Sequence, residues 1–178
     1  MGANEKHRLR ILAVEDNPDD AERVVLHLRR AFSVEYKRVE KASDFREAMT
    51  EDVWDVILCD YNLPDFNAFK ALEIAQSHDE NLPFIVVSGT IGESEAIALM
   101  DGGARDFVRK DNLSRLIPCI RRELRARDIW FRHLEAGKKL ATSERRFRAF
   151  IEHTPTPIHL KDISGRYMIA NRPFLSRF

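Results

Sequence analysis

The chain has 178 residues, of which 44% are hydrophobic and 33% charged, and its 29 basic and 29 acidic residues give a formal net charge of zero. This apolar content is enough for a packed core and excludes a disordered chain. The balanced charge excludes a general attraction to DNA, RNA or anionic membranes, so we expect specific local sites and no nucleic-acid partner.

The amino-terminal residues carry no apolar signal region, and no apolar run approaches the roughly 20 residues that a membrane span needs. We therefore expect a cytoplasmic protein without a membrane span. Both cysteines, Cys59 and Cys119, lie inside apolar runs, which predicts buried, reduced thiols and not a disulfide or a metal site.

Up to about Leu124, short apolar runs alternate with amphipathic stretches. The runs predict five strands, at residues 9–14, 34–39, 53–59, 84–87 and 107–108. The stretches between them predict four helices, at residues 21–30, 44–49, 68–75 and 93–100. Strands that alternate with helices indicate an α/β domain built on a parallel sheet.

From Leu113 a helical pattern continues beyond the predicted sheet. Between Arg121 and Arg148 it carries ten Lys or Arg against four Asp or Glu, which is typical of a solvated helix face; docking on an acidic partner is the alternative. Near-heptad spacing predicts a seam for a parallel homodimer at Ile117, Ile120, Leu124, Phe131, Leu134 and Ala141. Packing on the chain's own sheet is the competing interpretation, and it is favoured for residues 116–124.

The last part of the chain has a different pattern. Ser143 predicts the start of a separate short helix, which Thr154-Pro155-Thr156-Pro157 ends. Strands are expected at 158–160 and 167–170 around a turn at 162–165, and Asn171-Arg172-Pro173 begins another helix. One hairpin and one helical turn cannot form a core of their own, so we expect a domain that is cut short.

Polar side chains follow four of the predicted strands at their carboxyl ends, where ligands bind in open α/β sheets. They are Glu15 and Asp16 after the first strand, Asp60 after the third, Ser88 after the fourth and Lys110 after the fifth. Taken singly, each has a structural explanation, such as helix capping or a plain turn. Together they predict one pocket with three carboxylates, a hydroxyl and an ammonium.

Three crowded carboxylates repel one another unless a hard cation lies among them, and Mg²⁺ fits that requirement. Such a site suits phosphoryl transfer to a carboxylate. We expect Asp60 to accept the phosphoryl group and Glu15 and Asp16 to bind Mg²⁺. Lys110 and Ser88 would bind phosphoryl oxygens.

Four motifs occur in order: Val14-Glu15-Asp16-Asn17, Leu58-Cys59-Asp60-Tyr61-Asn62-Leu63-Pro64, Val86-Val87-Ser88-Gly89 and Gly103-Ala104-Arg105-Asp106-Phe107-Val108-Arg109-Lys110. They resemble the motifs of the response-regulator receiver (CheY-like) family. The resemblance implies a flavodoxin-like, doubly wound five-stranded sheet of order 2-1-3-4-5, Mg²⁺ dependence, and phosphorylation by a histidine kinase or histidine phosphotransfer protein.

The same resemblance implies that the backbone carbonyl of Asn62 is a metal ligand and that Ser88 and Phe107 form the switch. Phe107 stands where many members carry a tyrosine that swings inward on activation. Asp111 follows Lys110 where the family usually has a proline, often cis, so we expect the geometry of this loop to depart from the family pattern.

Segments of the tail, including residues 143–150, 154–158, 161–167 and 171–174, resemble the opening of a PAS domain. The expected organisation is therefore a receiver domain at 8–124, a helical linker at 125–142 and a truncated PAS-like segment at 143–178.

The leading hypothesis is a two-component receiver that catalyses its own phosphorylation and dephosphorylation and relays the signal through the C-terminal helix to a PAS-containing output. The parent would be a hybrid histidine kinase or a cyclic-dinucleotide enzyme. One alternative is a phosphorylation-independent pseudo-receiver that only binds proteins. Another is a Mg²⁺-dependent aspartyl-phosphate phosphatase, which usually needs a second Asp two residues after the nucleophile on the first strand; no suitable residue stands there.

Overall fold

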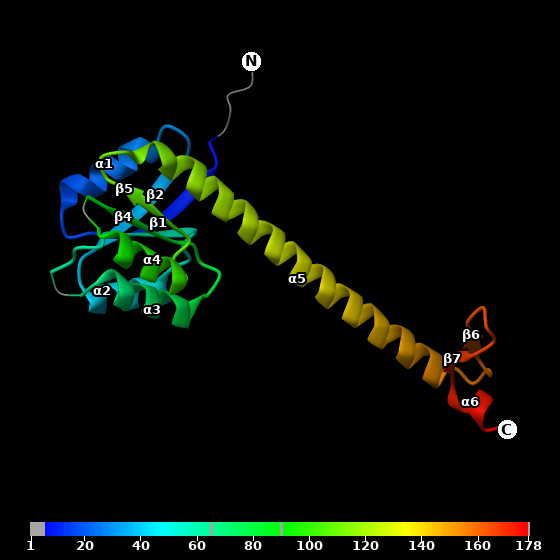
Figure 1. Ribbon diagram of the computed structural model, residues 1–178. Helices are drawn as coiled ribbons and strands as arrows, with labels where there is room; N and C mark the ends of the chain where they lie inside the picture. The colour runs from blue at the N-terminus through cyan, green and yellow to red at the C-terminus, as the bar shows by residue number, and fades with distance from the viewer. Residues whose placement is uncertain (1–5, 65, 90, 178) are drawn as a thin grey trace, which may run out of the picture. The chain divides into compact units, whose positions relative to one another are not determined.

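A five-stranded parallel sheet forms the first part of the chain in a computed structural model that describes residues 6–64, 66–89 and 91–177. Its strands are β1 (Arg8–Val14), β2 (Ser33–Val39), β3 (Val56–Cys59), β4 (Phe84–Ser88) and β5 (Asp106–Arg109). The helices between them are α1 (Pro18–Leu28), α2 (Ala42–Glu51), α3 (Ala68–His78) and α4 (Glu93–Asp101). The strand order β2-β1-β3-β4-β5 confirms the predicted flavodoxin-like topology (Figure 1).

Helices cover both faces of this sheet. Neighbouring residues of a strand point to opposite faces, so a strand that is apolar throughout needs cover on both. In β3, Ile57 and Cys59 belong to the core under α2, α3 and α4. Val56 and Leu58 belong to the core under α1 and the start of α5 (Leu116–His153). Figure 1 shows the two helical layers on either side of the strands. Cys59 and Cys119 are buried and free, as predicted.

Asparagine side chains begin two of the covering helices. Asn17 Oδ1 accepts a hydrogen bond from the backbone N of Asp19 at 3.0 Å, and Pro18 occupies the first turn of α1. Asn67 Oδ1 accepts from the backbone N of Lys70 at 2.9 Å at the start of α3. These caps satisfy backbone donors that the first turn of a helix leaves unpaired, and so fix the residues at which both helices begin.

The third strand begins later than the sequence predicted. Val53 is exposed, and β3 starts only at Val56. The carboxylate of Asp55 accepts a hydrogen bond from the backbone N of Arg10 at 2.8 Å, so a side chain occupies the position of the next ladder bond.

The helix α5 is continuous from Leu116 to His153, so the predicted start of a new helix at Ser143 is wrong. A glycine inside a helix costs only about 1 kcal/mol relative to alanine, and Gly137 is flanked by strong helix formers. Ser143 therefore lies within the helix and does not cap one. Within residues 6–64, 66–89 and 91–177, no helix is both long enough and apolar enough to cross a membrane.

The first turns of α5 belong to the core of the sheet domain. Leu116 and Ile120 are fully buried there, and Ile117 and Leu124 pack against the same cluster. The interpretation that this segment packs on its own sheet is therefore confirmed. Further along, Arg127 donates to the carbonyl oxygen of Trp54 at 3.1 Å and to a carboxylate oxygen of Asp79 at 3.4 Å.

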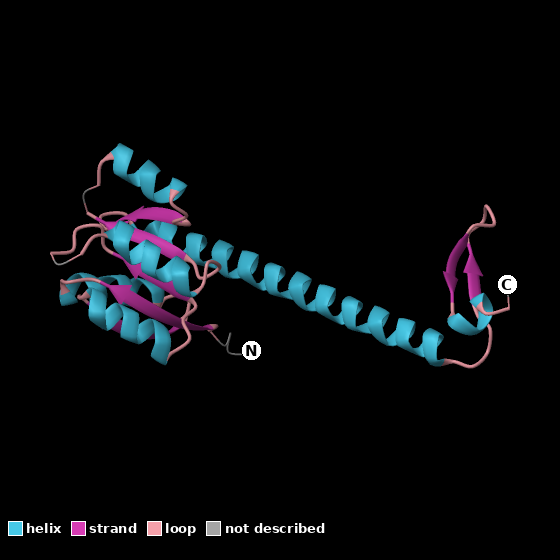
Figure 2. Ribbon diagram, turned by 90° about the horizontal axis from the view of Figure 1, so that it is seen from below, coloured by secondary structure: helices cyan, strands magenta, loops and turns pink. Residues whose placement is uncertain are grey.

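The chain separates into two compact units, Met1–Asp128 and Ile129–Phe178. In the second unit β6 (His159–Lys161) pairs antiparallel with β7 (Tyr167–Ala170), and the short helix α6 (Arg172–Leu175) lies beside them (Figure 2). The predicted hairpin and the helix after Asn171 are thus confirmed.

Asn171 joins the elements of the second unit. Its side chain is fully buried. Its amide nitrogen donates to the carbonyl oxygens of Ile151 (3.0 Å), Thr154 (3.4 Å) and Thr156 (2.8 Å), and its amide oxygen accepts from the backbone N of Ile158 (2.9 Å) and Phe174 (3.1 Å). One side chain therefore holds together the end of α5, the following loop and the start of α6.

Candidate functional site

The carboxyl ends of adjacent strands bring the predicted site residues to one edge of the sheet. Glu15, Asp60, Ser88 and Lys110 are buried there, and Asp16 is exposed. The backbone N of Lys110 donates to the carbonyl oxygen of Ser88 at 2.9 Å, which holds the ends of β4 and β5 together.

Carboxylate oxygens of Glu15, Asp16 and Asp60 lie within 4.8 Å of one another. The loop that carries the first two is held by Arg38, whose guanidinium donates to the carbonyl oxygens of Glu15 at 2.8 Å and Asp16 at 3.1 Å. The backbone N of Asp60 donates to the carbonyl oxygen of Val14 at 2.8 Å, which joins the ends of β1 and β3. Hard oxygen ligands at this spacing fit Mg²⁺.

The ammonium of Lys110 contacts three carboxylates at once. Its Nζ lies 2.7 Å from Glu15 Oε2, 2.8 Å from Asp60 Oδ2 and 2.8 Å from Asp20 Oδ2. The side chains of Glu15, Asp60 and Lys110 are each less than 10% exposed, whereas that of Asp20 is 27% exposed. The cluster thus holds one positive charge among several negative ones.

The loop after Lys110 begins with Asp111 and is anchored by an ion pair. No peptide bond among residues 6–64, 66–89 and 91–177 is cis, so Lys110 and Asp111 are joined by a trans bond. Asp111 forms a two-pronged pair with Arg109, with nitrogen–oxygen distances of 3.0 and 2.6 Å. Lys110 reaches Asp60 from this loop, so the absence of proline does not shorten its reach.

Burial and charge displace the pKa values of this cluster in different directions. Burial raises the pKa of Glu15, although the hydrogen bond from Lys110 works against it. Burial lowers the pKa of Lys110, but hydrogen bonds to Asp20, Asp60 and Glu15 outweigh it and the net pKa is raised. The hydrogen bond from Lys110 lowers the pKa of Asp20. Lys110 therefore remains an ammonium at neutral pH.

Sequence reasoning missed Asp20, which contacts Lys110 as closely as Asp60 does. A signal was present, because Asp20 lies in the first turn of the helix that begins directly after Glu15 and Asp16. Its contact with a lysine 90 residues later depends on how α1 packs, which local patterns do not reveal.

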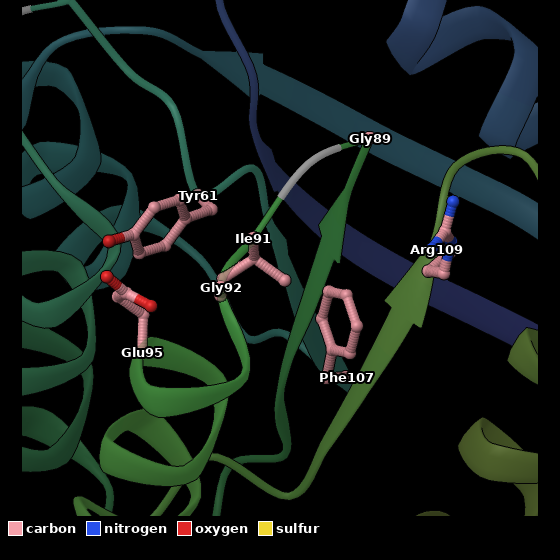
Figure 3. Close-up of a pocket in the computed structure, with 7 residues that line it drawn as sticks. All are labelled: Tyr61, Gly89, Ile91, Gly92, Glu95, Phe107 and Arg109. Atoms are coloured by element: carbon pink, nitrogen blue, oxygen red, sulfur yellow. The ribbon is translucent and has the colours of Figure 1, made fainter.

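Phe107 lies on β5, three residues before Lys110. It packs against the core and lines a hollow of about 360 Å³, together with Tyr61, Gly89, Ile91, Gly92, Glu95 and Arg109. Figure 3 shows Tyr61 and Glu95 on one side of this hollow and Phe107 and Arg109 on the other. The expected switch position therefore adjoins open space.

Asn62 is exposed in the loop after β3, and its backbone N approaches Asp60 Oδ1 at 3.5 Å. The loop therefore folds back toward the Asp60 carboxylate. This leaves its backbone near the three carboxylates that fit Mg²⁺.

Residues 11–121 match the family described as response regulator receiver domain. Among curated proteins, the virulence transcriptional regulatory protein PhoP of Salmonella typhimurium strain LT2 is 30% identical over 105 residues, which are 57% of this chain and 45% of that protein. The transcriptional regulatory protein GltR of Pseudomonas aeruginosa is 29% identical over 119 residues, 66% of this chain and 46% of that protein. The chain thus spans about half the length of these relatives.

Solved structures share the fold. An adenylate cyclase structure from Rhodopirellula baltica superposes with a TM-score of 0.64 at 21% identity, over 74% of this chain and 98% of that one. A CheY-like response regulator receiver domain protein from Methanospirillum hungatei superposes with a TM-score of 0.59 at 22% identity, over 67% and 96% of the two chains.

Proposed function

Because the chain belongs to the response regulator receiver domain family, we propose that it accepts a phosphoryl group on Asp60 from a histidine kinase or histidine phosphotransfer protein. The observation that carries the proposal is the position of the Asp60 carboxylate. It is buried at the end of β3, 2.8 Å from the ammonium of Lys110 and within 4.8 Å of the carboxylates of Glu15 and Asp16.

In the proposed reaction, an Asp60 oxygen forms a bond to phosphorus while the bond from phosphorus to the donor nitrogen breaks. The electron pair of that bond returns to the donor's imidazole. Lys110 and Ser88 bind oxygens of the transferred group. The metal would be held by Glu15, Asp16, Asp60 and the backbone carbonyl of Asn62. A bound Mg²⁺ supplies positive charge to the transferring oxygens.

Ser88 and Phe107 are the proposed switch. If the hydroxyl of Ser88 turns toward the phosphoryl group, the phenyl ring of Phe107 can move into the hollow between β5 and α4. A phenyl ring can be buried in this way, but it has no hydroxyl to form a hydrogen bond. Because β5 leads through a single 3-10 turn (Leu113–Arg115) into α5, a change at Phe107 reaches that helix directly.

The proposal is tested by incubating the purified chain with acetyl phosphate and Mg²⁺ and measuring the intact mass. We expect one phosphoryl group per chain, stable in acid and labile in alkali, that is absent from Asp60→Asn and after removal of Mg²⁺ by EDTA. The control is Asp128→Asn, which removes an exposed carboxylate on α5 and should leave the adduct unchanged.

Two other outcomes would overturn the proposal. Continuous turnover of a small phosphoester would indicate the aspartyl-phosphate phosphatase. A chain that forms no adduct and does not bind fluoroberyllate in the presence of Mg²⁺ would be a pseudo-receiver that only binds proteins.

We further propose the domain organisation expected from the sequence, with a receiver at 8–124, a helical linker at 125–142 and the start of a PAS-like output at 143–178. The hairpin and the capped helix after it support this assignment. PhoP and GltR are transcriptional regulators by name, but the chain matches about half of each. Their transcriptional output is therefore not carried over to this chain. The signal is proposed to pass to the PAS-like region instead.

A parallel homodimer through α5 is the proposed route of assembly, with a seam that differs from the one the sequence suggested. Ile117, Ile120 and Leu124 are occupied in the core of the sheet domain. Beyond Asp128, large exposed apolar side chains recur at heptad positions, at Ile129, Leu140, Phe147 and Phe150, with Ala136 between them. We call these five residues the α5 stripe.

Charge beside the α5 stripe favours a parallel partner. Lys139 and Glu144 flank the stripe five residues apart, which is the spacing of an attractive pair between parallel helices. Arg132, Lys139 and Arg146 share one flank, so an antiparallel arrangement would bring like charges together. A second copy of the chain therefore matches the stripe in heptad spacing and in charge.

Replacing Leu140 by Glu places a charge in the centre of the α5 stripe, and we expect the dimer to dissociate at least about tenfold more readily in sedimentation equilibrium. Leu134→Glu is the matched control, because Leu134 is exposed on the same helix but lies outside the stripe. If Leu134→Glu dissociates the dimer and Leu140→Glu does not, the seam suggested by the sequence is correct.

A further inference from the structure

Asp20 is a third close partner of Lys110, and neither the expected metal set nor the expected phosphoryl contacts include it. It belongs to the first turn of α1, and its Oδ2 lies 2.8 Å from Lys110 Nζ. Its other oxygen, Oδ1, lies 3.4 Å from a guanidinium nitrogen of Arg23 one turn later. The two cations hold the carboxylate with one oxygen directed at the site.

The three partners of Lys110 differ in what else they can bind. Glu15 and Asp60 belong to the carboxylate group that fits a metal, together with Asp16. Within residues 6–64, 66–89 and 91–177, that group does not include Asp20. If Glu15 and Asp60 turn their oxygens to Mg²⁺, their ion pairs with Lys110 weaken. Of its three carboxylate partners, Asp20 alone then still pairs fully with the ammonium.

We propose that Asp20 is a positioning residue that retains the Lys110 ammonium when Glu15 and Asp60 bind Mg²⁺. The inference rests on the proposed function, because it assumes that these two carboxylates serve the metal. With Asp20 in place, the lysine transfers its contacts to a neighbouring carboxylate and does not compete for the metal ligands. The ammonium also stays within reach of the carboxylate that accepts the phosphoryl group.

The test measures Mg²⁺ binding by titration calorimetry, without any phosphodonor. Asp20→Asn keeps the size of the side chain and removes its charge, so Lys110 should hold Glu15 and Asp60 more firmly. We expect the dissociation constant for Mg²⁺ to rise about tenfold, given the strength of close charge pairs near a protein surface. Asp19→Asn is the matched control, because Asp19 is an exposed acid in the same helical turn and is not among the described carboxylates that contact Lys110, so it should change the constant less than about twofold.

A second pair of variants separates an effect through Lys110 from a general loss of negative charge. In a Lys110→Ala background, Asp20→Asn and Asp19→Asn should change the Mg²⁺ dissociation constant equally, within about twofold. Equal effects of the two acids in the wild-type background would overturn the inference, and so would a tenfold effect of Asp20→Asn that persists without Lys110. If the wild-type chain binds no Mg²⁺ and forms no adduct, the proposed function itself fails, and this inference fails with it.

Discussion

Replacing Lys110 by Ala is expected to lower the free energy of unfolding by about 2 to 4 kcal/mol at neutral pH without Mg²⁺, because it leaves buried carboxylates without their counter-charge. Glu15 and Asp60 are buried around the ammonium, and Asp20 is partly exposed to water, which reduces its share. Urea unfolding followed by circular dichroism measures the change. Lys70→Ala is the control, because its pair with Glu73 is exposed and should change stability by less than about 0.5 kcal/mol.

The loss of stability in Lys110→Ala should depend on pH in a defined direction. Lys110 lowers the pKa values of both Glu15 and Asp20, so its removal raises them. A carboxyl group whose folded pKa is raised favours the folded state below its unfolded pKa and loses that benefit as pH rises through the folded value. The variant should therefore be closest to wild type near about pH 4 and furthest from it above about pH 7.

Mg²⁺ should restore more stability to Lys110→Ala than to the wild-type chain. The metal replaces the missing positive charge in the variant, whereas in the wild-type chain it competes with the ammonium for Glu15 and Asp60. An equal increment in both chains would contradict this competition.

Replacing Asn171 by Ala is expected to unfold the hairpin of the second unit. The change removes five hydrogen bonds from a fully buried side chain and leaves their backbone partners unsatisfied, at a cost of about 3 to 5 kcal/mol. Hydrogen exchange of the backbone amides at residues 154–175 should become fast, while exchange in the parallel sheet stays slow.

Asn171→Asp separates the donors of this side chain from its acceptor. It keeps the oxygen that accepts from Ile158 and Phe174 but loses the donors to three carbonyl groups. We therefore expect most of the acceleration of hydrogen exchange that Asn171→Ala causes. Asp162→Ala is the control, because the turn that Asp162 holds is exposed to solvent, so its loss should change the exchange of these amides much less than Asn171→Ala does. Slow exchange at residues 154–175 in Asn171→Ala would show that the hairpin is stable without this hub.

Much of the fold could be predicted because its signals are local and redundant. Apolar runs such as Ile57-Leu58-Cys59 are short and bounded, so all five strands of the sheet were predicted, although the third begins later than expected. The errors came from residues with more than one role. Ser143 is a residue type that can cap a helix, but here it lies inside one. Val53 has the composition of a strand residue, but the backbone N of Arg10 bonds to the Asp55 side chain in place of a strand partner.

The candidate site could be predicted in part for a related reason. Parallel topology sends the ends of β1, β3, β4 and β5 to one edge, so any polar residue placed there converges with the others. The contact of Lys110 with Asp20 depends on the position of a helix over the sheet and on the rotamer of a long side chain. Neither the helix position nor the rotamer can be predicted from the spacing of residues along the chain.

The contacts of Lys110 also bear on how the domain folds. Its hydrogen bonds to Asp60, Asp20 and Glu15 close chain segments of 50, 90 and 95 residues. Contacts between such distant residues repay their loop-closure entropy only late, once the intervening elements are ordered. We therefore expect the ion pairs of Lys110 to form only in the final, slowest phase of refolding, so that burial of its ammonium reports completion of the whole sheet.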